Sequence, residues 1–276
     1  MSTKVWFITG TSRGFGRVWT EAALARGDRV AATARTPESL APLVARYGPG
    51  VLPIRLDVTK KAEVTRAVAA AHNAFGRLDV VVNNAGHGLF GAVEEVGEAQ
   101  ARAQLETNFF GALWVTQAAL PYLREQRSGH IVQVSSVGGV LANANLGLYH
   151  ASKWALEAMA QSLAVEVREF GINVTIVEPA GYATDWSQSS AVRAAPNAAY
   201  DPMREARARV LKTRPPLGDP TATAEALLKV VDADDPPLRI FLGDVLDAVR
   251  NEYAQRLAVW ERWNAVSLAA YRPRRP

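Results

Sequence analysis

The stretch VWFITGTSRGFG, residues 5–16, runs from an apolar segment directly into a glycine-rich turn. The apolar segment predicts a buried strand, and the amphipathic residues 14–26 that follow predict a helix. Gly10, Gly14 and Gly16 allow a tight turn and let the backbone approach a ligand closely. Glycine also occurs in ordinary strand-to-helix turns, but this motif lies between the first strand and the first helix, where a helix N-terminus binds a pyrophosphate. The motif therefore predicts a dinucleotide-binding turn.

The rest of the chain repeats the alternation of strand-like and helix-like segments. Apolar runs predict strands at residues 30–34, 51–56, 78–82, 131–135, 172–177 and 238–242, and helical patterns cover residues 60–75, 100–125, 149–170, 220–231 and 244–271, with a further helix opening at Thr36 and Pro37. Strands rich in Val, Ile and Leu that alternate with helices predict a parallel sheet covered on both faces. We therefore expect a Rossmann-type doubly wound α/β fold and a single domain over residues 1–276.

Composition excludes several classes of protein. The 276 residues are 49% hydrophobic and 21% charged, which fits a globular protein with a large core. Cysteine is absent, and His72, His87, His130 and His150 show no metal-ligand spacing, so we expect no metal site. The N-terminal apolar run is too short for a signal peptide or a membrane span. These features predict a cytoplasmic protein without a membrane partner.

The charge balance is basic but carries little information about partners. The formal net charge is +4, and the isoelectric point is about 9.5. A basic isoelectric point is one sign of nucleic-acid binding. Here the basic residues are spread along the chain, and the one tight cluster is the tail, residues 272–276, which fits a solvated terminus. We therefore expect no nucleic-acid partner.

One long segment lacks a clear period. Residues 184–219 are rich in Ala, Arg, Ser and Pro, and a stretch of helix formers around residues 200–211 is flanked by prolines. Such a segment in a compact domain is often an active-site lid. We expect a mobile lid at about residues 184–216 that contains a short helix. The alternative is a rigid arm at a subunit interface.

A tyrosine and a lysine lie four residues apart in the segment YHASK, residues 149–153. At this spacing both side chains lie on one face of a helix. A free tyrosine has a pKa near ~10, and a neighbouring ammonium group lowers it toward the range useful for proton transfer. The pair Tyr149 and Lys153 is thus a candidate for acid–base chemistry. A surface lysine beside a half-buried tyrosine would give the same pattern.

Polar residues at predicted strand ends strengthen the catalytic interpretation. Ser135 and Ser136 end one strand, and the segment NNAG, residues 83–86, ends another. The carboxyl ends of strands in open α/β sheets face the ligand crevice. Asn108 lies in the middle of a predicted helix, where asparagine is unfavourable. Either it faces solvent or its side chain has a function.

The end of the second predicted strand bears on the choice of cofactor. Enzymes that prefer NAD usually carry an acidic residue there, which binds the ribose hydroxyls. This strand ends with Thr33, Ala34 and Arg35 and has no acid. A guanidinium group offers a fork of donors to the 2′-phosphate of NADP, and Arg13 in the glycine turn is placed to close on the same phosphate. Each arginine alone also fits a surface charge, but together they favour NADP(H).

In their order and spacing these motifs resemble the short-chain dehydrogenase/reductase family, in its branch with subunits of about this length. The TGxxxGxG turn, the NNAG strand end, the mid-helix Asn, the Ser and the YxxxK pair span residues 4–184, roughly two-thirds of the chain. The resemblance implies a nicotinamide-dependent oxidoreductase that interconverts a carbonyl and the corresponding alcohol, and the two arginines favour NADP(H) as its cofactor. It also implies a homo-oligomer, a dimer or a tetramer.

The resemblance assigns four catalytic positions. Tyr149 matches the general acid/base, and Lys153 matches the residue that lowers its pKa and holds the nicotinamide ribose. Ser136 matches the serine that hydrogen-bonds the substrate oxygen. Asn108 matches the residue that holds a water linking the lysine to solvent.

The resemblance also assigns the cofactor-binding positions. They are Gly10, Ser12, Arg13, Gly14, Phe15 and Gly16 in the turn, Arg35 at the 2′-phosphate, Asp57 and Val58 at the third strand end that contacts adenine in relatives, Asn84, Ala85 and Gly86, the pair Tyr149 and Lys153, and Pro179, Tyr182 and Thr184 beside the nicotinamide. In this last loop Ala180 replaces the usual glycine, and a shift of the turn by one residue to Gly181 would compensate.

The substrate site should lie above Ser136 and Tyr149. Its candidate walls are the apolar residues Leu89, Phe90, Val137, Leu141, Leu146, Trp186, Trp260 and Trp263. No charged residue is evident among them, which favours an apolar or aromatic ketone or aldehyde. The tryptophans equally fit a core or a subunit interface. Alternative functions on the same fold are an epimerase or dehydratase and a cofactor-sensing binding protein.

Overall fold

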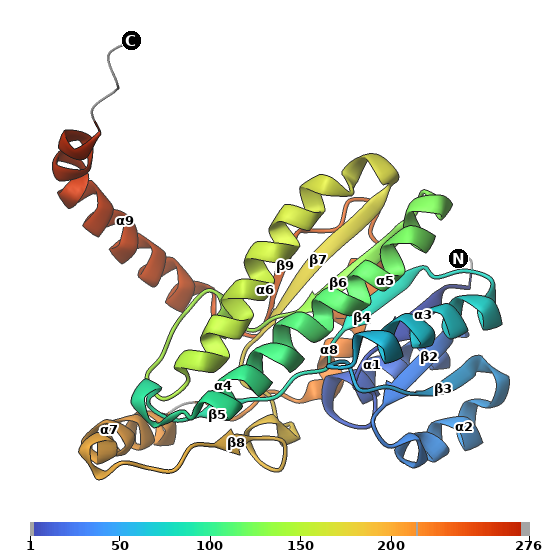
Figure 1. Ribbon diagram of the computed structural model, residues 1–276, viewed down its shortest axis with the longest axis horizontal. Helices are drawn as coiled ribbons and strands as arrows, with labels where there is room; N and C mark the ends of the chain where they lie inside the picture. The colour runs from blue at the N-terminus through green and yellow to red at the C-terminus, as the bar shows by residue number, and fades with distance from the viewer. Residues whose placement is uncertain (1–2, 214, 272–276) are drawn as a thin grey trace. The chain divides into compact units, whose positions relative to one another are not determined.

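Figure 1 shows the computed structural model of the chain, which describes residues 3–213 and 215–271. Seven strands form one parallel sheet in the order β3-β2-β1-β4-β6-β7-β9. The strands are β1 (Val5–Ile8), β2 (Arg29–Ala34), β3 (Val51–Arg55), β4 (Val80–Asn83), β6 (Gly129–Val134), β7 (Ile172–Pro179) and β9 (Arg239–Leu242). The strand order reverses between β1 and β4, and ligands of such sheets bind at the carboxyl ends beside this point. The predicted doubly wound fold is confirmed.

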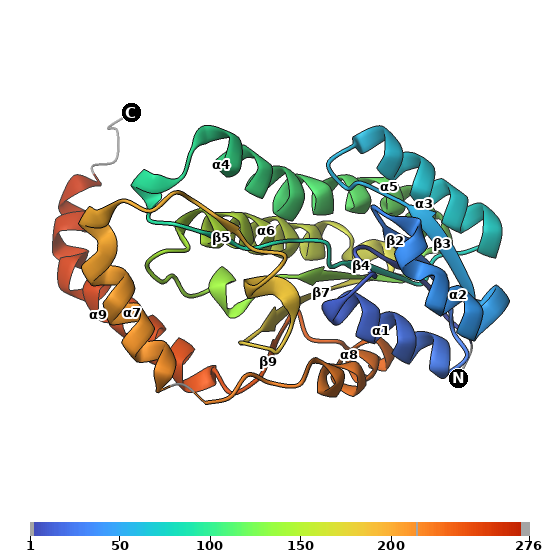
Figure 2. The same ribbon diagram turned by 90° about the horizontal axis from the view of Figure 1, so that it is seen from below.

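Helices cover both faces of the sheet, as Figure 2 shows from below. One face carries α1 (Gly14–Ala25), α2 (Ala41–Tyr47) and α8 (Thr223–Asp232), and the other carries α3 (Lys61–Phe75), α5 (Gly111–Gln126) and α6 (Gly147–Glu166). Successive side chains of a strand point to opposite faces. In β1, Trp6 therefore packs into the core between the sheet and α1, α2 and α8, and Phe7 packs into the core between the sheet and α3, α5 and α6. Two hydrophobic cores hold the sheet rigid, so its carboxyl edge is a firm base for a site.

The predicted helix over residues 100–125 is not continuous. It consists of α4 (Glu98–Leu105), a π-helical turn (Glu106–Phe110) and α5. A π turn inserts an extra residue into the helix and often marks a functional site. Asn108 lies inside this turn. The prediction was wrong in one further detail, because the segment that opens at Pro37 begins as a short 3₁₀ turn (Pro37–Leu40) before α2.

The predicted lid segment is anchored by a small sheet that the periodicity did not reveal. β8 (Val192–Arg193) pairs in parallel with β5 (Leu89–Phe90), which follows β4 in the chain. The short helix α7 (Asp201–Lys212) follows, flanked by Pro202 at its first turn. Figure 1 shows α7 and β8 in gold beside β5. Arg214, also in the predicted lid, lies outside the described residues, as does the basic tail.

The chain divides into two compact units, residues up to Gly243 and residues from Asp244 onward. The first contains the sheet and the helices described so far. Among the described residues of the second unit, one helix is present, α9 (Leu246–Ala270), and it carries Trp260 and Trp263, two of the candidate substrate walls. Among the residues the structure describes, no helix combines the length and apolarity needed to cross a membrane.

Candidate active site

The glycine turn has the backbone geometry that its sequence predicts. Gly10 and Gly14 have φ values of 70° and 57°, in the left-handed region that favours glycine. A Cβ at Gly16 would overlap the carbonyl oxygen of Gly10, so this position must lack a side chain for the helix to pack on the turn. Ser12 and Arg13 are exposed at the tip of the turn. The predicted turn residues are thus gathered around the start of α1.

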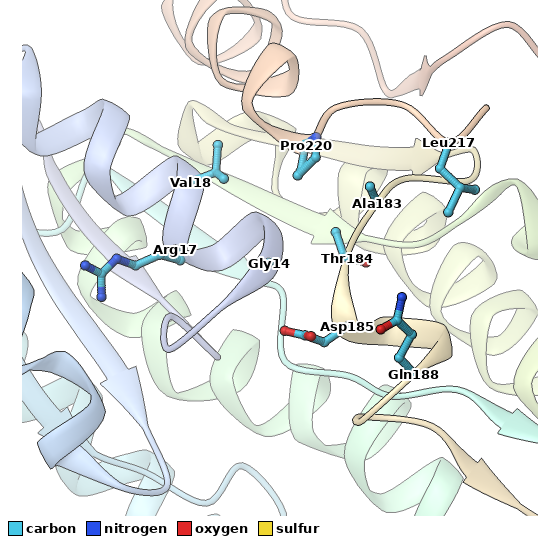
Figure 3. A pocket seen from close by; sticks show the side chains of 9 residues that line it. All are labelled: Gly14, Arg17, Val18, Ala183, Thr184, Asp185, Gln188, Leu217 and Pro220. Atoms are coloured by element: carbon cyan, nitrogen blue, oxygen red, sulfur yellow. The ribbon is translucent and has the colours of Figure 1, made fainter.

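The N-terminus of α1 fits a phosphate. The first backbone hydrogen bond of the helix runs from the Arg17 N–H to the Arg13 carbonyl, at 3.3 Å. The preceding N–H groups therefore have no helical acceptor and point outward from the positive end of the helix. No acidic side chain occupies the first turn. A cleft of about 340 Å³ opens beside it, and Figure 3 shows Gly14 and Thr184 on its walls.

The NNAG strand end is tied to the glycine turn. The Thr9 hydroxyl oxygen accepts hydrogen bonds from the N–H groups of Asn84 and Ala85, both at 2.9 Å. The Asn84 amide donates to the carbonyls of Thr9 and Gly10, at 2.8 and 3.1 Å. The Asn84 side chain therefore holds the turn in place. The sequence analysis did not single out Thr9, although a hydroxyl residue at a buried strand end was a visible signal.

Two further predicted cofactor positions lie at the end of β3. Asp57 accepts hydrogen bonds from the backbone N–H and the hydroxyl of Thr59, at 3.0 and 2.8 Å, which fixes the turn after the strand. Val58 is buried, and a Cβ at Gly111 would lie 2.7 Å from its Cγ2 atom. Val58 therefore packs on the start of α5, and the turn presents its backbone at the carboxyl edge of the sheet.

Arg35 is exposed directly after the last residue of β2. Burial lowers the pKa of His87, and the positive charges of Arg35 and Lys153 lower it further. His87 therefore lies within electrostatic reach of both cations, and it follows the NNAG segment. The Arg13 guanidinium, in the glycine turn, donates to the Ser189 hydroxyl at 3.2 Å. Both predicted phosphate-binding arginines are therefore exposed at the carboxyl edge of the sheet.

Tyr149 and Lys153 are both buried in the first turns of α6, with 5% and 6% of their surfaces exposed. This exposure excludes the alternative of a surface lysine. Lys153 Nζ donates to the Val134 carbonyl at 2.7 Å. Burial lowers the pKa of Lys153 to about 8, although the negative charge of Glu157 raises it in part. Burial raises the pKa of Tyr149 to about 12, opposed by a hydrogen bond with Ser136, so the phenol holds its proton at neutral pH.

A histidine that the sequence analysis missed shapes the loop over Tyr149. The Asn143 N–H donates to His150 Nε2 at 3.0 Å, so Nδ1 carries the proton and donates to the Gly138 carbonyl at 2.8 Å. Ser136 Oγ accepts from the Gly138 N–H at 3.0 Å. A Cβ at Gly138 would lie 3.1 Å from the Tyr149 ring. The loop therefore fits closely against the tyrosine and holds Ser136 beside it.

Asn108 faces the site and not solvent, since only 1% of its surface is exposed. Its Oδ1 accepts from the His87 N–H at 3.0 Å, and its Nδ2 donates to the His87 carbonyl and the Ser152 hydroxyl, at 3.0 and 3.1 Å. A Cβ at Gly86 would lie 3.2 Å from Asn108 Oδ1 and 3.7 Å from Lys153 Nζ. The π turn thus brings the asparagine beside the lysine.

Aromatic side chains line the space next to Tyr149. The ring centroids of Tyr149 and Trp186 are 4.8 Å apart, and those of Phe90 and Trp186 are 5.4 Å apart. A Cβ at Gly88 would lie 2.8 Å from the indole ring. The structure therefore brings together two of the predicted substrate walls, while Leu89 and Leu146 are buried in the packing around them.

The loop after β7 tolerates the missing glycine. Ala180 is not among the non-glycine residues with a positive φ in the described chain, so its backbone does not require glycine. The Gly181 carbonyl accepts from the Gly218 N–H at 3.0 Å, and the Ala183 N–H donates to the Gly218 carbonyl at 2.9 Å. The expected one-residue shift is unnecessary. The loop begins at Pro179, the last residue of β7.

Two aromatic residues join this loop to α1. The Tyr182 ring packs edge-on against Phe15, with centroids 5.1 Å apart, and Phe15 stacks on Trp19. Both predicted cofactor positions therefore have side chains engaged in packing. Thr184 accepts a hydrogen bond from the Trp186 N–H and faces Gly14 across the cleft (Figure 3). Within the described residues, no group of three or more His, Asp or Glu side chains is placed to hold a metal ion.

Comparisons with known proteins agree with this geometry. The sequence profile of the family described as short chain dehydrogenase matches residues 4–194. Oxidoreductase BOA17 of Botryotinia fuckeliana (strain B05.10) is 44% identical, over 97% of this chain and 99% of its own length. A short-chain dehydrogenase from Streptomyces avermitilis superposes with a TM-score of 0.90 at 39% identity, over 98% of this chain and 100% of that one. A short chain dehydrogenase from Burkholderia cenocepacia J2315, solved in complex with NADP, superposes with a TM-score of 0.75 at 26% identity, over 95% of this chain and 97% of that one. The chain belongs to the short-chain dehydrogenase/reductase family of oxidoreductases.

Proposed function

We propose that this oxidoreductase is an NADP(H)-dependent reductase that converts an apolar or aromatic ketone or aldehyde to the alcohol, and the reverse. The observation that carries the proposal is the burial of Tyr149 and Lys153, four residues apart in the first turns of α6, with Tyr149 hydrogen-bonded to Ser136, at the edge of the sheet where α1 also begins. Bound NADPH supplies the hydride. The protein supplies the proton and the orientation.

Each catalytic side chain has a separate task. The Ser136 hydroxyl holds the substrate oxygen, and Tyr149 donates its phenolic proton to that oxygen. The resulting phenolate is stabilised by the ammonium of Lys153, which the Val134 carbonyl orients. Asn108 is fixed by hydrogen bonds with His87 and Ser152. It would hold a water molecule through which a proton returns from solvent to the lysine. A positioned acid of this kind contributes ~10²–10⁴-fold to the rate.

The preference for NADPH rests on Arg35. Thr33 and Ala34 are buried at the end of β2, so Arg35 is the first exposed side chain there, in place of the acid that favours NAD. A guanidinium binds a phosphate through two parallel hydrogen bonds. The Burkholderia relative was solved with NADP, which agrees with this assignment.

The aromatic wall supports an apolar substrate. Trp186 packs at a tilt against both Tyr149 and Phe90, and such rings offer faces and edges to a ligand. Residues 184–216 act in this proposal as a lid that closes over the substrate and excludes water. We further propose that the protein is a homo-oligomer, which light scattering of the purified protein would establish.

A turnover screen tests the proposal. Purified protein is mixed with NADPH and a panel of ketones and aldehydes, and the loss of NADPH absorbance is followed. The proposal expects turnover with apolar or aromatic carbonyl compounds and stereodefined alcohol as product. NADPH binding without turnover of any compound would indicate a cofactor-sensing protein, and product formation without net NADPH consumption would indicate an epimerase or dehydratase.

A further inference from the structure

A second set of buried polar groups lies one helical turn beyond Lys153. Glu157 on α6, Glu178 on β7 and Ser135 after β6 are all buried, and Glu178 has no exposed surface. Arg239, the first residue of β9, reaches them from the neighbouring strand. The mechanism proposed above uses none of these four side chains. Carboxyl groups without exposed surface are rare unless they are paired or protonated.

One guanidinium serves two carboxyl groups. Arg239 Nε lies 3.1 Å from Glu157 Oε2 and 3.6 Å from Glu178 Oε1, and its Nη2 donates to Gln161 at 2.8 Å. Glu157 Oε1 and both carboxyl oxygens of Glu178 are buried and have no hydrogen-bond partner among the described residues. Two ionised carboxylates beside a single cation would leave a buried net negative charge, which is costly. One proton on the pair removes that charge and supplies a donor between the two groups.

The geometry indicates which carboxyl carries the proton. Glu157 is nearer to Arg239 Nε than Glu178 is, and the cation favours the ionised form of its closer partner. Burial and the charge of Glu157 raise the pKa of Glu178 to about 8, and Arg239 opposes this increase. At neutral pH the proton therefore belongs on Glu178 and the negative charge on Glu157.

The charge on Glu157 acts on Lys153. The two residues are four apart on α6, so their side chains lie on one face. The negative charge of Glu157 raises the pKa of Lys153, against the lowering by burial. The other titratable groups near this pair are Glu178 from β7, Arg239 from β9, Tyr149 four residues before Lys153 on α6, and His87, whose pKa the charge of Lys153 lowers.

Ser135 and Gly139 pack closely around Glu157. Neither residue is charged, so neither changes the charge balance of the carboxyl pair. A Cβ at Gly139 would lie 2.8 Å from Glu157 Oε1 and would overlap Ser135 Oγ. No side chain fits between these groups, and the Val134 carbonyl that binds Lys153 directly precedes Ser135. The carboxyl pair is therefore packed tightly behind the lysine.

We propose that Glu157 and Glu178 share one proton, and that the negative charge left on Glu157 keeps Lys153 protonated in the working pH range. Both are positioning residues, since they act on the reaction through the lysine. Glu178 directly precedes Pro179, so its ionisation would also place a charge at the start of the loop beside the cofactor cleft. The kinetic consequence rests on the proposed reductase function, whereas the shared proton does not.

Infrared spectroscopy of the resting protein tests the shared proton without turnover. A protonated carboxylic acid has a C=O stretch at higher frequency than ionised carboxylates and backbone amides, and this band shifts in D₂O. We expect the band at pH 7 in the wild type and in Glu166→Gln, which changes an exposed glutamate on the same helix. We expect its loss in Glu178→Gln. A wild-type protein without the band, or a band that persists in Glu178→Gln, overturns the proposal.

The pH profile tests the effect on Lys153. NADPH-dependent kcat/KM should fall as pH rises through the pKa of Lys153. In Glu157→Gln this alkaline limb should move to lower pH by about one unit, a roughly tenfold loss of activity on that limb, because the opposing charge is gone. Glu178→Gln should shift the limb less, because its neutral amide resembles the protonated acid.

The conservative variant and the control define the outcomes. Glu157→Asp keeps the charge and should restore the limb toward the wild-type position, and Glu166→Gln should leave it unchanged. Equal shifts in Glu157→Gln and Glu178→Gln would mean that both carboxyls are ionised, and would overturn the proposal. If Glu157→Gln does not fold, the infrared comparison of the wild type with Glu178→Gln still decides whether the two carboxyl groups share a proton. If no carbonyl compound is reduced, the proposed function fails and the infrared result stands by itself.

Discussion

The indole of Trp186 packs against the phenol of Tyr149, with ring centroids 4.8 Å apart and the planes tilted by 60°. Trp186 lies two residues after Thr184, at the start of the predicted lid, so the lid begins in contact with the proposed proton donor. The contact requires Gly88, where any side chain would collide with the indole. The first residues of the predicted lid and the proposed proton donor therefore pack together, as one wall of the proposed substrate site.

Replacement of Trp186 by alanine should weaken the binding of aromatic substrates. An aromatic pair contributes about 0.5–1.5 kcal/mol beyond its buried area, so KM for an aromatic ketone should rise by about tenfold. The change should be smaller for a small aliphatic ketone. Steady-state kinetics measures both, and Tyr122→Ala, which removes an aromatic ring near the end of α5 that stacks on His72, is the control. An unchanged KM for the aromatic ketone in Trp186→Ala would remove this residue from the substrate wall.

Replacement of Arg35 by aspartate should reverse the cofactor preference. The loss of a charge-assisted hydrogen bond and the gain of a like charge should weaken NADPH binding by about tenfold to a hundredfold, while NADH binding improves. Fluorescence titration of both cofactors measures the ratio. Arg66→Asp, an exposed position in the middle of α3, controls for the change in net charge. Equal affinities of the wild type for NADPH and NADH would contradict the NADP assignment.

The sequence predicted the sheet well because its signals are local. Each strand is a short apolar run, each helix has its own period, and polar residues such as Ser136 and Asn84 mark strand ends. Parallel strands with these features meet at one edge whatever the rest of the chain does. This is why the predicted site residues are found along the carboxyl edge of the sheet.

The features that the sequence did not predict depend on contacts between distant segments. β5 and β8 are two residues long, too short for a period of two to be recognised. In the π turn, the Asn108 side chain donates hydrogen bonds to His87 and Ser152, which lie 21 and 44 residues away in the sequence. The pairing of Glu157 with Glu178 depends on how α6 packs on β7. None of these contacts leaves a pattern in the neighbouring residues.

Acid should destabilise the protein through His130. Thr175 donates its only hydroxyl hydrogen to the Pro237 carbonyl, so neutral His130 must donate to Thr175 through Nε2. Burial lowers the pKa of His130 to about 4. Below pH 6.5 the unfolded chain binds a proton that the folded protein does not, so stability is complete above that pH and falls by about 2 kcal/mol at pH 5.

Urea unfolding at pH 7 and pH 5 measures this loss. His130→Gln keeps a donor for Thr175 but cannot titrate, so its stability should depend less on pH. His72→Gln, at a half-buried position of α3 where the ring stacks on Tyr122, is the control and should keep the wild-type dependence on pH. A pH dependence that is the same in His130→Gln and the wild type would show that the destabilisation arises elsewhere.

The polar contacts of α7 should control the motion of the lid. Arg204 pairs with the buried carboxylate of Glu95 at 2.6 Å, and the Arg207 guanidinium donates to the Ala144 carbonyl at 3.2 Å. No residue of α7 is buried, so polar contacts of this kind contribute to holding the helix in place. We expect amides of residues 184–213 to exchange rapidly in the free protein, faster still in Arg204→Gln, and slowly in the complex with NADPH and substrate.

Hydrogen exchange followed by mass spectrometry measures this difference. Arg209→Gln, on the same helix but paired with the exposed Glu205, is the matched control. Strong protection of the segment in the free protein, unaltered by ligands, would instead support the rigid arm at a subunit interface.

The central claim is that Tyr149 donates the proton, and one comparison tests it most directly. Tyr149→Phe keeps the buried ring against Trp186 but removes the hydroxyl group. Single-turnover reduction and NADPH titration are carried out on both proteins with the best substrate from the screen. The account predicts that the rate of reduction falls by about a hundredfold or more while NADPH affinity stays within about twofold. A Tyr149→Phe protein that reduces the substrate at a rate near that of the wild type would contradict it.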